Sequence, residues 1–209
     1  MKQKGILIVI SGPSGTGKGT ICKALAQTNK YWISVSATSR KPRVDEVDGS
    51  TYFFLTVDDF KNRILQKDFL EYAQVYGNYY GTPKSNVQKK LESGDDVILE
   101  IDIQGALKIK ETFPEGIFIF VLPPSMEELK KRITLRQSET AESLMTRFKS
   151  AYKELNYISK YNYAVVNTTV KSAVNKIESI IIAEKCRVDR IQGSILDSKE
   201  GILHERRYD

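Results

Sequence analysis

The chain has 209 residues, 41% of them hydrophobic and 28% charged, a balance that indicates one soluble globular domain and excludes a disordered or membrane-spanning chain. Its single histidine, His204, excludes a histidine-built metal site, and its two cysteines, Cys22 and Cys186, lie far apart, as expected in a reducing cytoplasm. A formal net charge of +6 predicts anionic partners, either nucleic acid or nucleotides.

The first predicted strand, residues 6–10, leads into a glycine-rich loop, Gly12-Pro13-Ser14-Gly15-Thr16-Gly17-Lys18-Gly19-Thr20. An apolar strand followed by G-x-x-x-x-G-K and a helix is typical of a phosphate-binding loop. Its glycines let successive backbone N–H groups point inward, and the helix adds its positive end. Lys18 supplies a charge for the outer phosphates. Gly19 stands where Ser or Thr usually binds magnesium, and Thr20 follows one residue later.

The pattern changes between residues 34 and 81, where we predict a small α+β insertion that carries substrate. Residues 51–57 and 69–75 are predicted as short antiparallel strands, with a helix over 59–66 between them and a turn at 77–81. Arg40 and Arg43 precede them in an extended, proline-containing segment. Two arginines can grip one phosphate, and Tyr52 and Tyr80 can donate to the same anion. The alternative is an exposed basic loop.

Glu71 is a carboxylate within an otherwise apolar predicted strand. Alternation along the strand allows it to lie on an exposed face. The functional interpretation is base recognition. A carboxylate accepts two parallel hydrogen bonds from the N1–H and the exocyclic amine of guanine, an edge that adenine does not offer, and such a contact separates guanine from adenine by about tenfold to a hundredfold or more.

Three further apolar runs, at residues 97–103, 117–122 and 163–166, alternate with helical patterns and predict a parallel sheet. Glu100 and Asp102 occupy alternate positions of the first run and should share one face near its carboxyl end, where parallel sheets bind ligands. Such an acid in phosphate-loop proteins usually holds magnesium, often through water.

Helices are predicted at residues 126–136, 140–158 and 170–186, the first opened by a capping box of Ser125 and Glu128. Arg132, Arg136 and Arg147 flank the linker between the first two. A helix–loop–helix with inward arginines can close over a transferring phosphoryl group, although these arginines also suit an exposed helix surface. No recognisable chemistry lies beyond about residue 188.

Together these residues make the chain resemble the guanylate kinases, the nucleoside-monophosphate kinases that phosphorylate GMP, from about residue 5 to residue 186. The resemblance implies an α/β fold: a P-loop parallel sheet flanked by helices, with a small α+β nucleotide-binding insertion and a helical lid. It implies one domain over residues 1–209, divided into a core (1–33, 83–124 and 159–188), a GMP-binding insertion (34–82), a lid (125–158) and a tail (189–209).

The resemblance also implies roles for individual residues. The catalytic group is Lys18, Arg136, Arg147 and Glu100. ATP is bound by Gly12, Pro13, Ser14, Gly15, Thr16, Gly17, Lys18, Gly19, Thr20 and Asn167. GMP is bound by Ser36, Arg40, Arg43, Tyr52, Glu71, Tyr80, Thr82 and Asp102. Magnesium, the cofactor, is held by Thr20 with either Glu100 or Asp102, directly or through water. Thr82 precedes Pro83, so its alternative role is to cap the next helix.

The implied activity is transfer of the γ-phosphoryl of ATP to GMP, and also to dGMP, by a cytoplasmic monomer or homodimer with no membrane or specific nucleic-acid partner. A kinase for another monophosphate is the nearest alternative. A non-catalytic guanylate-kinase-like module is disfavoured because the phosphate loop is intact, and a regulatory GTPase because no N-K-x-D motif is present. RNA binding through the basic surface stays open as a secondary activity.

Overall fold

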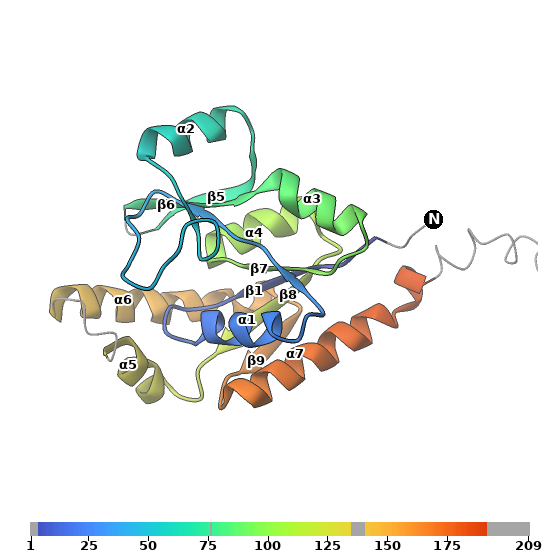
Figure 1. Cartoon of the computed structure of the whole chain (residues 1–209). Helices are drawn as coiled ribbons and strands as arrows, with labels where there is room; N and C mark the ends of the chain where they lie inside the picture. Colours follow the sequence, from blue (N-terminus) through green and yellow to red (C-terminus); the bar gives the residue numbers. More distant parts are fainter. Residues whose placement is uncertain (1–3, 76, 135–140, 192–209) are drawn as a thin grey trace, which may run out of the picture.

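A parallel five-stranded sheet forms the centre of the protein (Figure 1). The structure, a computed structural model, describes residues 4–75, 77–134 and 141–191. The strand order is β2 (Trp32–Ile33), β7 (Val97–Glu100), β1 (Leu7–Ser11), β8 (Ile117–Leu122) and β9 (Tyr163–Val166), and all four neighbouring pairs run parallel. The predicted α/β fold with a parallel sheet is confirmed.

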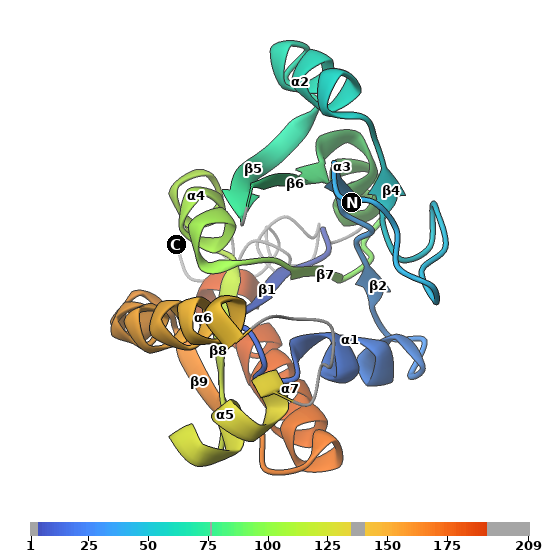
Figure 2. The same cartoon turned by 90° about the vertical axis from the view of Figure 1, so that its left-hand side faces the viewer.

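Helices cover both faces of this sheet (Figure 2). Because side chains alternate along a strand, Ile8 and Ile10 of β1 pack on the face covered by α1 (Lys18–Ala26) and α7 (Val170–Lys185). Leu7 and Val9 pack on the opposite face, which α3 (Lys84–Glu92) and α4 (Ile103–Thr112) cover. Burial on both faces explains why β1 is apolar at every position before Ser11.

A second, four-stranded sheet lies beside α4, in the order β4 (Phe53–Phe54), β3 (Ala37–Thr38), β6 (Asn78–Pro83) and β5 (Phe69–Val75). β4 pairs parallel with β3, and β5 pairs antiparallel with β6. The predicted antiparallel strands at 51–57 and 69–75 are therefore not neighbours. The predicted turn at 77–81 is wrong beyond Gly77, because β6 pairs along the length of β5. Helix α2 (Val57–Leu65) begins earlier than predicted, since Thr56 accepts a hydrogen bond from the Asp59 N–H.

The remaining helices are α5 (Met126–Thr134), α6 (Ala141–Glu154) and a 3-10 helix at Leu155–Lys160. The predicted cap is confirmed: Ser125 Oγ accepts the Glu128 N–H at 3.1 Å. The strand predicted over 97–103 is too long, because β7 ends at Glu100 and Asp102 caps α4, a helix that the sequence interpretation missed. No helix within the described ranges is long and apolar enough to cross a membrane.

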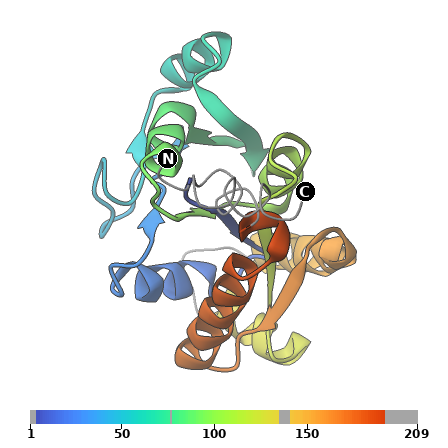
Figure 3. The same ribbon diagram turned by 90° about the vertical axis from the view of Figure 1, so that its right-hand side faces the viewer.

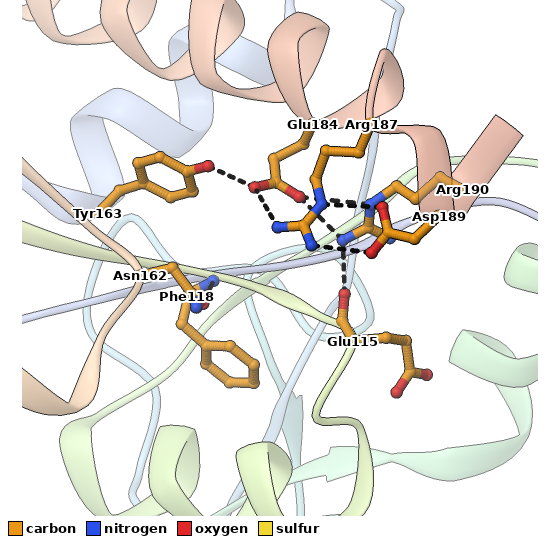
Figure 4. A network of polar contacts seen from close by, with 8 residues as sticks. All are labelled: Glu115, Phe118, Asn162, Tyr163, Glu184, Arg187, Asp189 and Arg190. Atoms are coloured by element: carbon orange, nitrogen blue, oxygen red, sulfur yellow. Dashed lines mark hydrogen bonds and ion pairs between the residues drawn. The ribbon is translucent and has the colours of Figure 1, made fainter.

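A polar network holds the carboxyl-terminal end of α7, near the end of the sheet at which β1 begins (Figures 3 and 4). Tyr163 of β9 donates to the buried Glu184, which also accepts from Arg190 at 3.0 Å. Arg190 in turn donates to the carbonyl oxygen of Glu115 at 2.6 Å. The network connects α7 to β9 and to the loop before β8. It lies at the opposite end of the sheet from the glycine-rich loop.

Candidate active site

The glycine-rich loop connects the carboxyl end of β1 to the first turn of α1. Gly12, Gly15 and Gly17 have φ angles of 140°, 86° and 91°, a region that favours glycine. Lys18 Nζ donates to the carbonyl oxygens of Gly12 at 2.5 Å and Pro13 at 2.9 Å, so the lysine folds back over the loop. This geometry places an ammonium group and the amino end of a helix at one anion-binding turn.

Asn167 holds the other side of the loop. Its Nδ2 donates to the Thr16 carbonyl oxygen at 2.8 Å, and both side chains are buried. A Cβ atom on Gly17 would lie 2.5 Å from the same Nδ2, closer than real Cβ atoms approach. Glycine is therefore required at position 17 both by its backbone angle and by the close approach of Asn167.

A cavity of about 370 Å³ opens beside this part of the loop. Thr20, an exposed residue on α1, is among the residues that line it. The residues that share the cavity with Thr20 come from the loop, α5 and the segment after β9: Gly15, Gly17, Arg132, Asn167, Thr168, Thr169 and Val170. Another cavity, of about 400 Å³, lies near Lys4 and Arg190 and includes none of the predicted site residues.

Glu100, at the end of β7, faces Gly19. A Cβ atom on Gly19 would lie 3.3 Å from Glu100 Oε1, so the carboxylate packs against the first turn of α1. Burial raises the pKa of the Cys22 thiol well above its usual range, Glu100 raises it further, and Lys18 acts in the opposite direction. The charges of Glu100 and Lys18 thus both reach this buried thiol of α1.

Arg40 lies at the centre of an aromatic and acidic cluster in the second sheet. Its guanidinium donates two hydrogen bonds of 2.8 Å to Glu46, and its Cζ lies 5.4 Å from the ring centre of Tyr52. Hydrogen bonds to Glu46 and Tyr80 raise the arginine pKa above its usual range. The Tyr52 and Tyr80 rings meet edge to face at 6.1 Å. Three of the four residues predicted to bind one phosphate thus converge.

The fourth, Arg43, has an exposed side chain, and its backbone N–H donates to Glu46 at 2.8 Å. Ser36, predicted to contact a base, is half-buried at the start of β3, and its carbonyl oxygen accepts the Phe53 N–H at 2.9 Å. The pKa of Tyr52 is raised to about 12 by burial and then by the charge of Glu100. This electrostatic effect links the cluster to the carboxylate beside the loop.

Glu71 is buried, with only 6% of its surface exposed, so the exposed-face alternative is wrong. The register of β5 and β6 sets it opposite Thr82, whose Oγ1 donates to Glu71 Oε1 at 2.7 Å. The alternative that Thr82 caps a helix is also wrong, because α3 begins after Pro83 without a side-chain cap. Burial raises the pKa of Glu71 to about 7, and Asp102 contributes in the same direction.

Asp102, whose charge acts on Glu71, also caps a helix. Its Oδ1 accepts the Gly105 N–H at 2.8 Å, which caps α4. The expectation that Glu100 and Asp102 share one strand face is wrong: the strand ends between them, so Glu100 faces α1 while Asp102 influences Glu71. Only Ile101 separates the two carboxylates along the chain.

Comparison with known proteins places these features in a family. The Guanylate kinase family model matches residues 4–184. A guanylate kinase of Clostridium acetobutylicum is 69% identical over 209 residues, the whole of both chains. The chain belongs to the guanylate kinase family. A guanylate kinase of Clostridium tetani is 68% identical over 207 residues, covering 99% of this chain and 100% of the relative.

A solved structure agrees with this assignment. The crystal structure of guanylate kinase from Anaplasma phagocytophilum superposes with a TM-score of 0.79 at 31% identity, covering 95% of this chain and 96% of that one. Members of the guanylate kinase family phosphorylate GMP with ATP, so the predicted family, fold and enzyme class are confirmed.

The structure describes only one of the three arginine side chains that are predicted to flank the lid linker of this guanylate kinase family member. Arg132 on α5 donates to Glu128 at 2.8 Å and lines the cavity with Asn167. Arg136 lies outside the described residues. Arg147 lies in α6, and its side chain is also outside the described part of the chain. Where these two side chains lie relative to the loop therefore stays a prediction.

Glu154, the last residue of α6, is a candidate that the sequence interpretation missed. Burial raises its pKa, whereas Lys18 and the backbone N–H of Ser14 lower it. A carboxylate from α6 therefore lies at the anion-binding loop of this guanylate kinase family member. Glu154 ends an amphipathic helix and carries no local motif, so only the tertiary packing brings it to the loop.

Proposed function

We propose that this member of the guanylate kinase family binds ATP at the loop and the adjoining cavity, binds GMP or dGMP at residues 34–82, and transfers the γ-phosphoryl between them. The ATP half consists of residues 12–20 with Asn167. The carrying observation is the buried Glu71–Thr82 pair, which lies within electrostatic reach of Asp102, two residues from the carboxylate that faces the first turn of α1.

Residues 34–82 supply side chains that can bind a phosphate and side chains that can recognise a base. Arg40, with Tyr52, Tyr80 and Arg43, holds the GMP phosphate through charge-assisted hydrogen bonds. Glu71 Oε1 accepts one hydrogen bond from Thr82, which orients the carboxylate and leaves it able to accept hydrogen bonds from the N1–H and amine of guanine. Ser36 and Asp102 complete the guanine site.

Transfer needs no side-chain nucleophile, because a phosphate oxygen of GMP attacks the γ-phosphorus in line. Lys18 exchanges the Gly12 and Pro13 carbonyl oxygens for phosphate oxygens of ATP. Arg136 and Arg147 neutralise charge on the transferring group when residues 125–158 close as a lid and exclude water.

The residues beside the loop suit a magnesium ion held largely by ATP. Magnesium keeps several waters and uses one or two carboxylates with substrate phosphates, so no cluster of three protein ligands is needed, and the described residues contain none. Glu100 fits best, through water, because it lies against Gly19; Asp102 is the alternative, and Thr20 lines the cavity that adjoins the loop. The ion would offset phosphate charge during transfer.

We also propose a cellular compartment and an oligomeric state for the protein. Cys22 is buried and Cys186 exposed, and both are free thiols, which supports a reducing cytoplasm. Either a monomer or a homodimer suits a site whose described parts all come from one chain.

A coupled assay for ADP formation tests the proposal, with ATP and a panel of acceptors: GMP, dGMP, AMP, CMP and UMP. We expect turnover with GMP and dGMP and at least tenfold lower kcat/KM with the others. Lys18→Met should abolish turnover, whereas Lys23→Met, at an exposed position of the same helix, should not. ADP release at the no-acceptor rate in the presence of GMP, or equal use of AMP, would contradict it.

A further inference from the structure

Gly105 lies where the first turn of α4 meets the Glu71 carboxylate. It is buried, and its N–H donates to Asp102 at the cap of the helix. A Cβ atom at this position would lie 2.6 Å from Glu71 Oε2 and 3.0 Å from its Cδ, against an ordinary contact of at least 3.4 Å. The absence of a side chain at Gly105 therefore allows α4 to approach the carboxylate this closely.

The helix backbone has little freedom to retreat from such a contact. The residues that follow Gly105 on α4, Ala106 and Ile109, are 1% and 0% exposed and pack against β1 and β7 in the core. The carboxylate is the free end of a flexible side chain, held by one hydrogen bond from Thr82. A methyl group at position 105 is therefore accommodated by displacing the Glu71 carboxylate rather than the helix.

We infer that Gly105 is a specificity-determining position of the acceptor site, because it sets where the Glu71 carboxylate lies. The inference rests on the proposed role of Glu71 in reading guanine. A carboxylate displaced by about 1 Å no longer meets both donors of the guanine edge, and misplacements of this size cost up to about a hundredfold in rate. We expect ATP binding to be unaffected, because the three atoms nearest to a Cβ at position 105 all belong to Glu71.

The test is Gly105→Ala in the full chain, with steady-state kinetics for GMP, AMP and ATP and a thermal unfolding curve. Gly105 has no left-handed φ, and alanine favours a helix more than glycine, which offsets part of the cost of moving the buried carboxylate away from Thr82, so the variant should still fold. We expect KM for GMP to rise at least tenfold, the preference for GMP over AMP to fall by a similar factor, and KM for ATP to stay within about twofold.

Gly116→Ala is the matched control. Gly116 follows α4, has no left-handed φ, and would bring a Cβ within 3.1 Å of Phe113 O and Phe118 Cε2, far from Glu71. It should leave the preference for GMP over AMP unchanged. Gly105→Ala combined with Glu71→Gln should lose no more GMP preference than Glu71→Gln alone, since both changes act through one carboxylate.

Unchanged GMP kinetics in Gly105→Ala, an equal rise in KM for ATP, failure of that variant to fold, or additive losses in the double variant would each overturn the inference. Glu71→Gln separates this from the proposed function. If Glu71→Gln itself keeps the full preference for GMP over AMP, the proposed role of Glu71 fails. If Glu71→Gln loses that preference and Gly105→Ala does not, only the role of Gly105 fails.

Discussion

Raising the pH from 6 to 8 should increase kcat/KM for GMP through the ionisation of Glu71. Burial, aided by Asp102, raises the pKa of this carboxyl to about 7, against an ordinary value of 4.5. The difference corresponds to about 3 kcal/mol in favour of the neutral acid at this site. Only the ionised form offers acceptors to both guanine donors, so GMP use should follow the ionised fraction.

The magnitude follows from that pKa. About one tenth of the Glu71 carboxyl is ionised at pH 6 and about nine tenths at pH 8, so kcat/KM for GMP should rise about tenfold from this group. The phosphate of GMP also titrates near pH 6. We therefore take the ratio of wild type to Glu71→Gln at each pH, because both proteins meet the same GMP and the ratio isolates Glu71.

The assay is ADP formation at saturating ATP with GMP varied at pH 6, 7 and 8. A wild-type to variant ratio that stays constant across this range refutes the reasoning.

Stability offers a second measurement of the same ionisation. Because the folded-state pKa lies above the unfolded one, the folded protein binds the extra proton, and the free energy of unfolding should fall as pH rises from 4.5 through 7. Urea unfolding of Glu71→Gln should lack that fall.

Three other substitutions probe contacts of the site. Glu46→Gln loosens the two 2.8 Å hydrogen bonds that orient Arg40, so KM for GMP should rise about fivefold by steady-state kinetics, with KM for ATP unchanged. Gly17→Ala forces a left-handed backbone and a clash with Asn167, so ATP affinity by equilibrium titration should fall at least tenfold and stability by about 1–2 kcal/mol. Glu154→Gln removes a negative charge beside the loop, so KM for ATP should fall severalfold.

Matched controls accompany these variants. Asp45→Asn alters the exposed neighbour of Glu46, and a comparable effect on GMP would contradict the role of the ion pair. Gly77→Ala imposes the same backbone strain at φ 81° with no atom within 4 Å, so it should spare ATP affinity. Glu127→Gln removes an exposed carboxylate from α5; if it lowers KM for ATP as much as Glu154→Gln, the effect is one of net charge alone.

Features encoded over a few consecutive residues could be predicted from the sequence. β8 and β9 have the predicted bounds, because short apolar runs of a parallel sheet carry a strong local signal, although only β8 is buried along nearly its whole length. The phosphate loop was equally readable, since its glycines and Lys18 form a contiguous motif. The cap at Ser125 was found for the same reason.

Contacts between distant segments were not predictable in this way. The sequence allows two roles for Thr82, and only the register of β5 and β6 decides that its hydroxyl donates to Glu71. No glycine, proline or other turn residue separates Asp102 from the apolar run before it. The sequence pattern therefore predicts one strand where the structure has the end of β7 and the cap of α4. Glu154 and Gly105 become informative only once α6 and α4 are packed in place.

The segment from Glu100 to Asp102 has a mechanical consequence. One end packs against the first turn of α1, and the other caps the helix that touches Glu71. Planar peptides of fixed length limit the reach of three residues, so the carboxylate that faces α1 and the carboxyl that caps α4 can never lie far apart. The proposed ATP and GMP sites therefore meet at this segment, whose two acidic side chains serve one proposed site each.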